Sequence, residues 1–267
     1  MEIERLEDRR PVRRSATGAF TLMELLVVMA VIALLAALLV PALSAGKGQS
    51  QSAACQNRLR QIGIAMTMYV SDYNRYPPLA DTNAGVNSLQ ICFDKFYPYY
   101  PLRWTNAVWN CPTYLASGGV VLSGYEQMWI DWCSYAYNWS GTGDPRRDHL
   151  GLGFRMDLSQ TIAREPEVLA PSQMYAVADT RPTIWSNAPH GNIKMQFYSF
   201  GVSRFNSVAS QESPPPHDRA YNVLFCDGHV VKVPRTEYLY PPTSAHHWNR
   251  DNKPHPETWI FPWAVQN

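Results

Sequence analysis

The sequence has almost no excess of positive charge with which to bind a polyanion. Its 267 residues include 23 lysines and arginines against 22 aspartates and glutamates, a formal net charge of +1. Charged residues make up only 17% of the chain. Proteins that bind nucleic acid usually carry a strongly basic patch or stripe, because the phosphate backbone dominates their affinity. The charge balance therefore gives no support to nucleic-acid binding.

Motifs of catalysis and of structural metal sites are also missing. The chain contains no GxSxG and no HExxH sequence. The glycines of GTGDP at 141–145 lack the strand–helix context and the following lysine of a phosphate loop. The cysteines form no CxxC pair, which argues against a zinc ribbon. We therefore expect the protein not to be an enzyme and to need no cofactor.

The cysteine count is odd, so at least one thiol is left without a partner in the chain. The five cysteines are Cys55, Cys92, Cys111, Cys133 and Cys226. Disulfides form outside the cytoplasm, and Cys92, Cys111 and Cys133 fall in one loop-rich stretch. A bridge among these three is one hypothesis. The alternative is that all five cysteines are small buried apolar side chains.

A long apolar run occupies the N-terminal part of the chain. Residues 25–40 carry no charged or strongly polar side chain, and the wider span 20–43 adds one carboxylate, Glu24. About 20 helical residues suffice to cross a bilayer core of about 30 Å. We predict a transmembrane helix over 20–43. A cleaved signal peptide would have a shorter apolar region, and a plain membrane anchor would not explain Glu24.

The helical pattern continues beyond the apolar run, through residues 44–78. Apolar side chains recur at spacings of three and four, at Leu59, Ile62, Met66, Tyr69 and Tyr73. A face of this kind packs against other elements, most simply a sheet. The YPP sequence at 76–78 should stop the helix. We predict one helix from about Thr21 to Tyr73, kinked or locally melted at Pro41.

The remaining residues, 79–267, are rich in proline and aromatic residues, as expected for a loop-rich exported domain. Loops with short strands are expected over 79–150, and a buried strand is expected at 174–179. The stretch 217–233 is expected to contain a β-hairpin that turns at Asp227 and Gly228 with positive φ. The predicted fold class is α+β. A long N-terminal helix, transmembrane in its first half and amphipathic in its second, would pack on an antiparallel β-sheet.

Residues 19–24, AFTLME, resemble the prepilin signal of type IV pilin-like proteins. In that family a basic leader, here 1–19, is cut before an aromatic residue, and a glutamate stands fifth in the mature chain. The resemblance implies cleavage between Ala19 and Phe20 and N-methylation of Phe20. It also implies that Glu24 pairs with the amino group of a neighbouring subunit during assembly. The family usually has glycine before the cut, where this chain has Ala19.

Further segments are similar to enlarged pilin-like families of planctomycete and verrucomicrobial type. They are CQNRLRQIG at 55–63, YPP at 76–78, CP at 111–112 and SYAYN at 134–138. His217, Asp227 and Gly228 match the H-x9-DG signature of prepilin-type processing-associated domains. That signature implies no enzymatic role.

The resemblance implies a structural subunit of a type II secretion pseudopilus or a type IV pilus-like filament. Its partners would be a prepilin peptidase and other pilin-like subunits. The chain would cross the inner membrane once, with the N-terminus in the cytoplasm and the globular domain in the periplasm or outside the cell. The arginines that favour this orientation are Arg9, Arg10, Arg13 and Arg14.

An alternative function is a membrane-anchored surface module, such as a minor pilin or an adhesin, that binds a glycan or another substrate. Exposed tryptophans and tyrosines could stack on such a ligand. Aromatic side chains along an exposed groove would favour binding, and buried aromatic side chains would favour a structural role.

Two groups of side chains are weak candidates for metal ligands. The first is near the expected hairpin and comprises His217, Asp218, Asp227 and His229. For this group we favour a structural interpretation, in which Asp227 caps the turn and His217 bonds to the backbone. The second group could supply oxygen ligands to calcium, as a C-terminal loop does in some secretion pseudopilins, although no EF-hand spacing is present. It comprises Asp251, Asn252 and Glu257.

Overall fold

The computed structural model describes a little under three fifths of the chain. The described ranges are 21–78, 80–81, 90–91, 95–100, 110–116, 134–143, 148–153, 162–179, 183–185, 194–196, 217, 219–238 and 240–258. The chain divides into two compact units, Met1–Gly46 and Lys47–Asn267. We describe each unit by itself.

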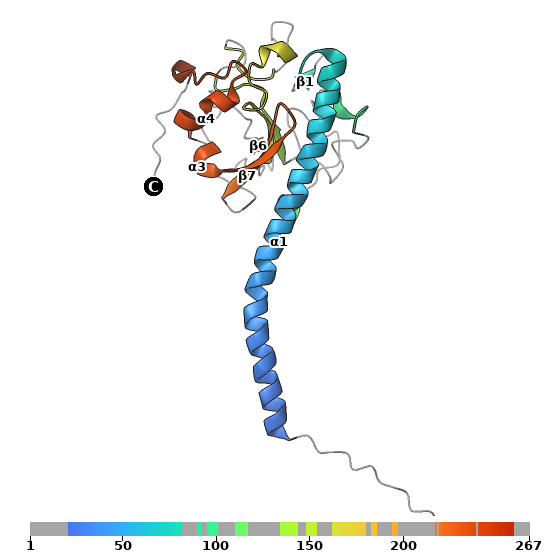
Figure 1. Cartoon of the computed structure of the whole chain (residues 1–267), viewed down its shortest axis with the longest axis vertical. Helices are drawn as coiled ribbons and strands as arrows, with labels where there is room; N and C mark the ends of the chain where they lie inside the picture. Colours follow the sequence, from blue (N-terminus) through green and yellow to red (C-terminus); the bar gives the residue numbers. More distant parts are fainter. Residues whose placement is uncertain are drawn as a thin grey trace, which may run out of the picture. The chain divides into compact units, whose positions relative to one another are not determined.

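Helix α1 (Leu22–Tyr73) is a single helix of 52 residues, close to the predicted limits (Figure 1). It continues through Pro41, so of the two predicted effects, a kink or local melting, the melting does not occur. Proline removes one hydrogen bond from a long ladder, and the leucines and alanines on both sides favour helix. The helix ends where Asn74 takes a left-handed conformation, with φ of 52°, and donates to the Val70 carbonyl at 2.7 Å.

In the first unit, every described side chain is exposed. These residues form the apolar part of α1. The most apolar stretch of 18 residues in this helix has a mean hydropathy of 3.0. Within the described residues, α1 is long and apolar enough to cross a membrane. At its start, Thr21 Oγ1 accepts from the Glu24 backbone N–H at 3.2 Å. The Thr21 backbone N–H donates to Glu24 Oε2 at 2.9 Å. This reciprocal pair is a capping box.

The second unit is built on a four-stranded antiparallel sheet, which confirms the predicted α+β class. The strands are β3 (Tyr135–Tyr137), β4 (Tyr175–Asp179), β7 (Ala220–Phe225) and β8 (Val230–Pro234), in the order β3-β4-β7-β8. Two separate strand pairs join β1 (Ala80–Asp81) to β2 (Gln90–Ile91) and β5 (Thr183–Trp185) to β6 (Lys194–Gln196). The short helices are α2 (Pro112–Ala116), α3 (Arg235–Tyr238) and α4 (Pro241–Trp248), with 3-10 turns at Glu165–Glu167 and Pro256–Thr258.

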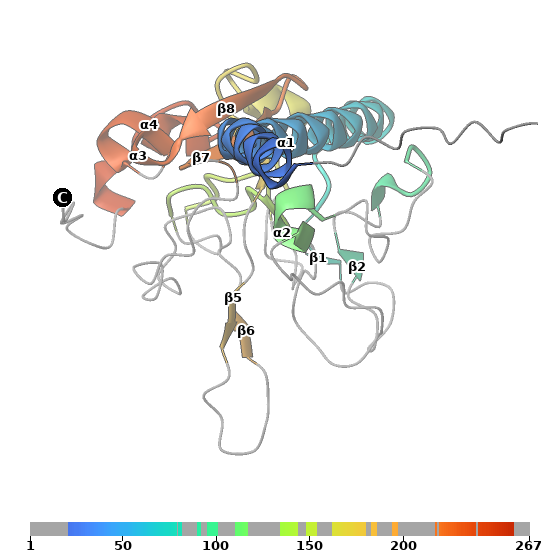
Figure 2. The same cartoon turned by 90° about the horizontal axis from the view of Figure 1, so that it is seen from below.

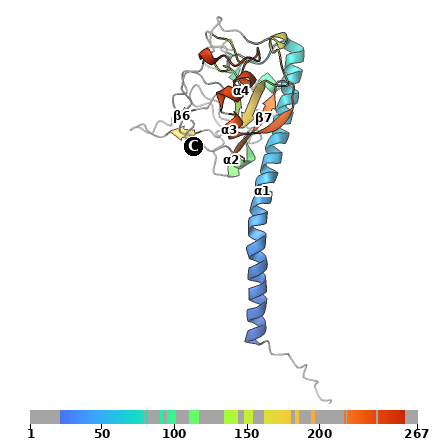
Figure 3. The same ribbon diagram turned by 60° about the vertical axis from the view of Figure 1, so that its left-hand side comes forward.

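The central strands are covered on both faces. The second half of α1 lies beside β7 and β8, and α3 and α4 also lie against these strands (Figures 2 and 3). Alternation along β7 separates two cores, because successive side chains point to opposite faces. Leu224 joins the core with α1, whereas Val223 and Phe225 join the core with α3 and α4.

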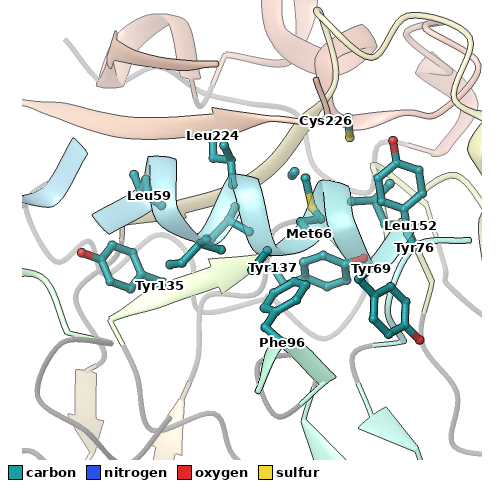
Figure 4. Close-up of a cluster of buried hydrophobic side chains, with 14 of the residues drawn as sticks. Leu59, Met66, Tyr69, Tyr76, Phe96, Tyr135, Tyr137, Leu152, Leu224 and Cys226 are labelled. Atoms are coloured by element: carbon teal, nitrogen blue, oxygen red, sulfur yellow. The ribbon is translucent and has the colours of Figure 1, made fainter. Parts of the chain in front are cut away.

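The core between α1 and the sheet uses most of the predicted face of the helix. Leu59, Ile62, Met66 and Tyr69 are buried there. Figure 4 labels Leu59, Met66 and Tyr69 among these side chains. Tyr73 is an exception, since it is 53% exposed at the last residue of the helix and its ring stacks on Tyr69 at 4.5 Å. The helix can approach the sheet closely because residue 63 is glycine. A Cβ there would lie 2.7 Å from Leu224 Cδ1.

Strand β4 has a shift in its pairing with β7, and this shift decides toward which face of the sheet its last side chain, Asp179, points. Its register against β7 shifts between Tyr175 and Val177, and Ala176 and Val177 both belong to the core with α1. From Val177 onward the alternation is regular, so Ala178 faces α3 and α4. Asp179 therefore faces the α1 side, where it is 1% exposed.

The hairpin between β7 and β8 has a three-residue loop. The Gly228 N–H donates to the Phe225 carbonyl at 3.0 Å, and the Phe225 N–H donates to the His229 carbonyl at 2.9 Å. Gly228 has a φ of 94°, a left-handed conformation that glycine adopts without strain. Of the two predicted turn residues, only Gly228 has a positive φ. The Asp227 carboxylate accepts from the His229 backbone N–H at 3.1 Å.

Candidate functional site

Four buried side chains with metal-binding or nucleophilic chemistry meet inside the second unit. Cys55 comes from α1, Cys111 stands just before α2, Asp179 ends β4, and His217 precedes β7. The four residues are between 0% and 4% exposed. One ligand atom from each side chain lies within 4.8 Å of the others. We call this group the Cys2HisAsp cluster.

Each member reaches the cluster for a local structural reason. Cys55 lies one helical turn before Leu59, on the face of α1 that packs on the sheet. Asp179 faces the same side because of the shifted register of β4. Cys111 N–H donates to the Ser134 hydroxyl, and the Ser134 N–H donates to Asn110 Oδ1 at 3.1 Å. These bonds tie the start of α2 to the start of β3.

The contacts within the cluster are short. Cys111 Sγ lies 3.1 Å from His217 Nε2. The same nitrogen lies 3.1 Å from Asp179 Oδ2. Cys55 Sγ lies 3.2 Å from Asp179 Oδ2. Nε2 of the imidazole, one carboxylate oxygen and two sulfur atoms thus point toward one small volume.

A second layer of polar groups fixes the orientation of these side chains. His217 Nδ1 lies 3.1 Å from Thr113 Oγ1. The Asn222 backbone N–H donates to Asp179 Oδ1, and the Asn222 amide donates to Asp179 Oδ2, both at 2.9 Å. The Tyr135 hydroxyl donates to Cys55 Sγ at 3.5 Å. Ordered outer contacts of this kind hold a preformed site in place.

The four groups perturb one another electrostatically. A hydrogen bond from Cys55 lowers the pKa of the Cys111 thiol to about 4, and His217 acts in the same direction against burial. Burial by itself would lower the pKa of His217, but the hydrogen bonds to Asp179 and Cys111 raise it to about 9. Burial raises the pKa of Asp179 and of Cys55. These shifts favour a thiolate at Cys111 beside a protonated His217, and the neutral forms of Asp179 and Cys55.

The geometry is poorly suited to a cysteine nucleophile. In a catalytic triad the nucleophile and the carboxylate bond to different nitrogens of the histidine, which lets the imidazole relay a proton. Here Cys111 and Asp179 both contact Nε2 of His217, and Nδ1 faces Thr113. Cys111 is also completely buried, so a substrate has no access to it.

The predicted grouping of hairpin ligands is wrong for His217. Its ring bonds to side chains of the cluster rather than to backbone, near the start of β7. Asp227 and His229 lie at the other end of that strand, where Asp227 Oδ1 is 2.5 Å from His229 Nδ1. Six strand residues separate the two ends by about 20 Å. Asp218 lies outside the described residues.

The candidate calcium ligands face a histidine. His255 Nε2 lies 2.6 Å from Asp251 Oδ2, and His255 Nδ1 lies 2.8 Å from Glu257 Oε1. The Asn252 amide donates to Gln173 Oε1 at 3.2 Å. Asp251 and Glu257 are thus bridged by an imidazole, an arrangement that stabilises the tail rather than one that leaves oxygens directed at a shared cation.

The other predicted positions give a mixed result. Cys111 is a free thiol, so the expected bridge does not include it, and Cys92 and Cys133 lie outside the described residues. Cys226 is free and buried, and burial raises the pKa of its thiol. Ala19 and Phe20, the expected cleavage site, also lie outside the described residues.

The Cys2HisAsp cluster was not predicted from the sequence. Its members are far apart along the chain, since Asp179 is 124 positions after Cys55 and His217 is 106 positions after Cys111. One signal was present, because Cys55, Cys111 and His217 each belong to a separate segment of the pilin-like resemblance. Asp179 carried no such signal, since it follows an ordinary buried strand.

Comparison with known families gives a local similarity. The model of a family described as a protein of unknown function (DUF1559) matches residues 51–105. The matched segment, about a fifth of the chain, includes Cys55 and the buried face of α1. No curated protein matches the chain. No solved structure matches it either.

Proposed function

We propose that the protein is a pilin-like structural subunit of a type II secretion pseudopilus or a type IV pilus-like filament. Before assembly it is held in the inner membrane by the first half of α1, with the globular unit outside the cytoplasm. A prepilin peptidase removes residues 1–19 and the new N-terminus is methylated. The role is structural rather than catalytic.

The observation that carries this proposal is the change in environment along α1. From Thr21 to Ser50 every side chain is exposed, although most of them are apolar, and the buried positions begin at Ser52. Leu22, Leu38 and Leu43 are each more than two thirds exposed. Such a surface must be covered by lipid or by other apolar helices, because large exposed apolar patches are unstable in water. A pilin-like subunit meets both environments in turn.

Two further findings support the proposal. The matched family covers the part of α1 that packs on the sheet, and the matched segment contains the CQNRLRQIG sequence that resembles enlarged pilin-like families. Among the described aromatic residues, most are buried in the two cores, including Tyr135, Tyr137, Tyr175 and Trp248. Buried rings favour a structural role over the alternative of a glycan-binding module.

Glu24 has a role within its own chain that must be separated from a role in assembly. In the structure it completes the capping box with Thr21. In a filament it would be enclosed by apolar helices, where an unpaired carboxylate is strongly penalised. The free amino group of Phe20 in a neighbouring subunit is positive near neutral pH and would be its partner.

Two substitutions at Glu24 test this proposal. Glu24→Ala removes both the cap and the charge, whereas Glu24→Gln keeps a side chain that can cap the helix and removes only the charge. We expect both variants to insert and to be processed, because alanine and glutamine are good helix formers in an apolar span. We expect both to fail to form multimers, measured by cross-linking and by recovery of sheared filaments with each variant as the sole subunit.

The control is the mature N-terminus of each variant, determined by mass spectrometry. If Glu24→Gln assembles like the wild type while Glu24→Ala does not, the residue acts as a cap and the pairing is refuted. Normal assembly of both variants would favour a plain membrane-anchored domain. An unprocessed Met1 terminus in wild-type cells with an active prepilin peptidase would refute the filament proposal.

A further inference from the structure

We propose that Cys55, Cys111, Asp179 and His217 bind one Zn²⁺ ion in a closed tetrahedral site. This inference does not depend on the proposed function, since it follows from the interior of the second unit alone. The site lies between α1 and the sheet and joins four segments that are distant in sequence.

The distances in the cluster suit a zinc ion. Zinc bonds to sulfur, nitrogen and oxygen are about 2.0–2.3 Å long, so the ligands of a tetrahedral site lie about 3.3–3.8 Å apart. The contacts between His217 Nε2, Asp179 Oδ2 and the cysteine sulfurs are 3.1–3.2 Å. All four ligand atoms lie within 4.8 Å of one another. The three shortest contacts would lengthen by a few tenths of an ångström, and the widest separation would shorten by up to about 1 Å, to complete the coordination sphere.

The hydrogen-bond pattern of the cluster also leaves a place for a cation at its centre. Nδ1–H of His217 can donate to Thr113 Oγ1, because the Thr113 hydroxyl itself donates to Gln51 Oε1 at 3.5 Å. With the proton on Nδ1, the lone pair of His217 Nε2 faces the Asp179 carboxylate and the Cys111 sulfur, and a metal ion takes the place of the Nε2 proton that a protonated imidazole would donate to them. The single S–H of Cys55 cannot serve both of these acceptors. One divalent cation at the centre would satisfy the four inward-facing lone pairs together.

The outer contacts match those of a metal site. A metal-bound histidine usually donates its second ring N–H to an oxygen, as His217 does to Thr113, and a metal-bound carboxylate is usually held by further hydrogen bonds. Asn222 provides two such bonds to Asp179. Four protein ligands without an open position are typical of structural zinc rather than catalytic zinc.

The ligand types select the metal. Two thiolates, one imidazole and one carboxylate suit zinc, whereas calcium and magnesium prefer oxygen ligands only. With both cysteines ionised and His217 neutral, the ligands carry three negative charges, and Zn²⁺ leaves a net charge of −1. The donated bonds from Asn222 and Tyr135 stabilise this remaining charge.

The first experiment measures metal in the full-length chain. The protein is purified from membranes in detergent, with a tag that contains no histidine and without chelators, and its metal content is determined by inductively coupled plasma mass spectrometry. We expect about one zinc per chain, and we expect chelation to lower the melting temperature by about 5 °C or more, reversed by zinc but not by calcium. Less than about 0.1 zinc per chain, even after incubation with zinc, would overturn the proposal.

The second experiment assigns the ligands. Cys111→Ser and His217→Gln should each reduce zinc affinity by about tenfold or more. The matched controls, Cys226→Ser and His229→Gln, alter a cysteine and a histidine outside the cluster and should retain the metal. Since a ligand variant can fail to fold, cobalt is also bound to the wild-type chain. Intense visible bands of tetrahedral Co²⁺ with thiolate charge transfer are expected. The weak spectrum of an octahedral oxygen site would overturn the assignment.

The third experiment excludes a disulfide. Peptide mapping with alkylation in denaturant and chelator should show Cys55 and Cys111 as free thiols without added reductant. A Cys55–Cys111 disulfide in protein free of metal would overturn the proposal, and so would stoichiometric iron or copper in place of zinc.

Discussion

Two isoleucines that are two residues apart, on opposite faces of α1, give a matched test of how the helix packs on the sheet. Ile62 is 1% exposed in the core with Leu224, whereas Ile64 is 60% exposed. Replacing Ile62 with alanine removes three carbon atoms, worth about 2.4 kcal/mol of transfer free energy at about 0.8 kcal/mol each. The cavity adds to this, and the total for such sites is about 2–5 kcal/mol. Alanine has a better helix propensity than isoleucine, which offsets about 0.4 kcal/mol of this loss in stability.

The expected net loss for Ile62→Ala is therefore about 2–4 kcal/mol, and for Ile64→Ala it is below about 1 kcal/mol. For a unit of this size a change of 1 kcal/mol shifts the melting temperature by about 2–4 °C. The assay is thermal unfolding of the full-length chain in detergent, followed by near-ultraviolet circular dichroism. A drop of about 4–16 °C is expected for Ile62→Ala and little change for Ile64→Ala. Equal shifts for the two variants would refute the packing of α1 on the sheet.

Three further predictions concern the hairpin, processing and the tail. Gly228→Val should destabilise the second unit by about 1–3 kcal/mol, because valine is strained at a φ of 94°; an unchanged melting curve would contradict this. The mature chain should begin with N-methylated Phe20, as read by mass spectrometry of the membrane-bound protein. Burial opposes protonation of His255, but Asp251 and Glu257 raise its pKa above 6.5. The protonated His255 should therefore stabilise the tail fully below about pH 6.5. This stabilisation should be lost as the pH rises through the pKa of His255 in the folded protein. Hydrogen exchange at 249–258 should show this, and His255→Asn should abolish the dependence.

The sequence predicted the elements whose causes are local. The helix from Leu22 to Tyr73 follows from apolar composition and then from spacings of three and four, which act within a few turns. The hairpin follows from the glycine at position 228. Tyr73 was predicted to lie on the buried face of the helix but is exposed. The spacing of apolar residues does not tell where the sheet that covers the helix ends.

The Cys2HisAsp cluster could not be predicted in the same way. The lack of a CxxC pair argued against a zinc ribbon, but a zinc site needs four ligands in space rather than two in sequence. Asp179 reaches the cluster only because the register of β4 shifts after Tyr175. His217 was grouped with Asp227 and His229 near one end of the hairpin because it is close to them in sequence, yet the length of β7 carries it to the opposite end of the strand.

The position of Cys55 within α1 has a mechanical consequence. The attached part of the helix extends from Ser52 to Val70, about 28 Å along its axis. Tension applied along that axis loads these contacts in shear, so they resist together instead of peeling apart one by one. The stress is greatest at the end nearest the pulled segment, which is the turn that holds Ser52 and Cys55. The side chains joined to α1 at that turn, Asp179 and Asn222, are anchored in the two central strands, so force entering the helix is passed directly to the stiffest part of the sheet.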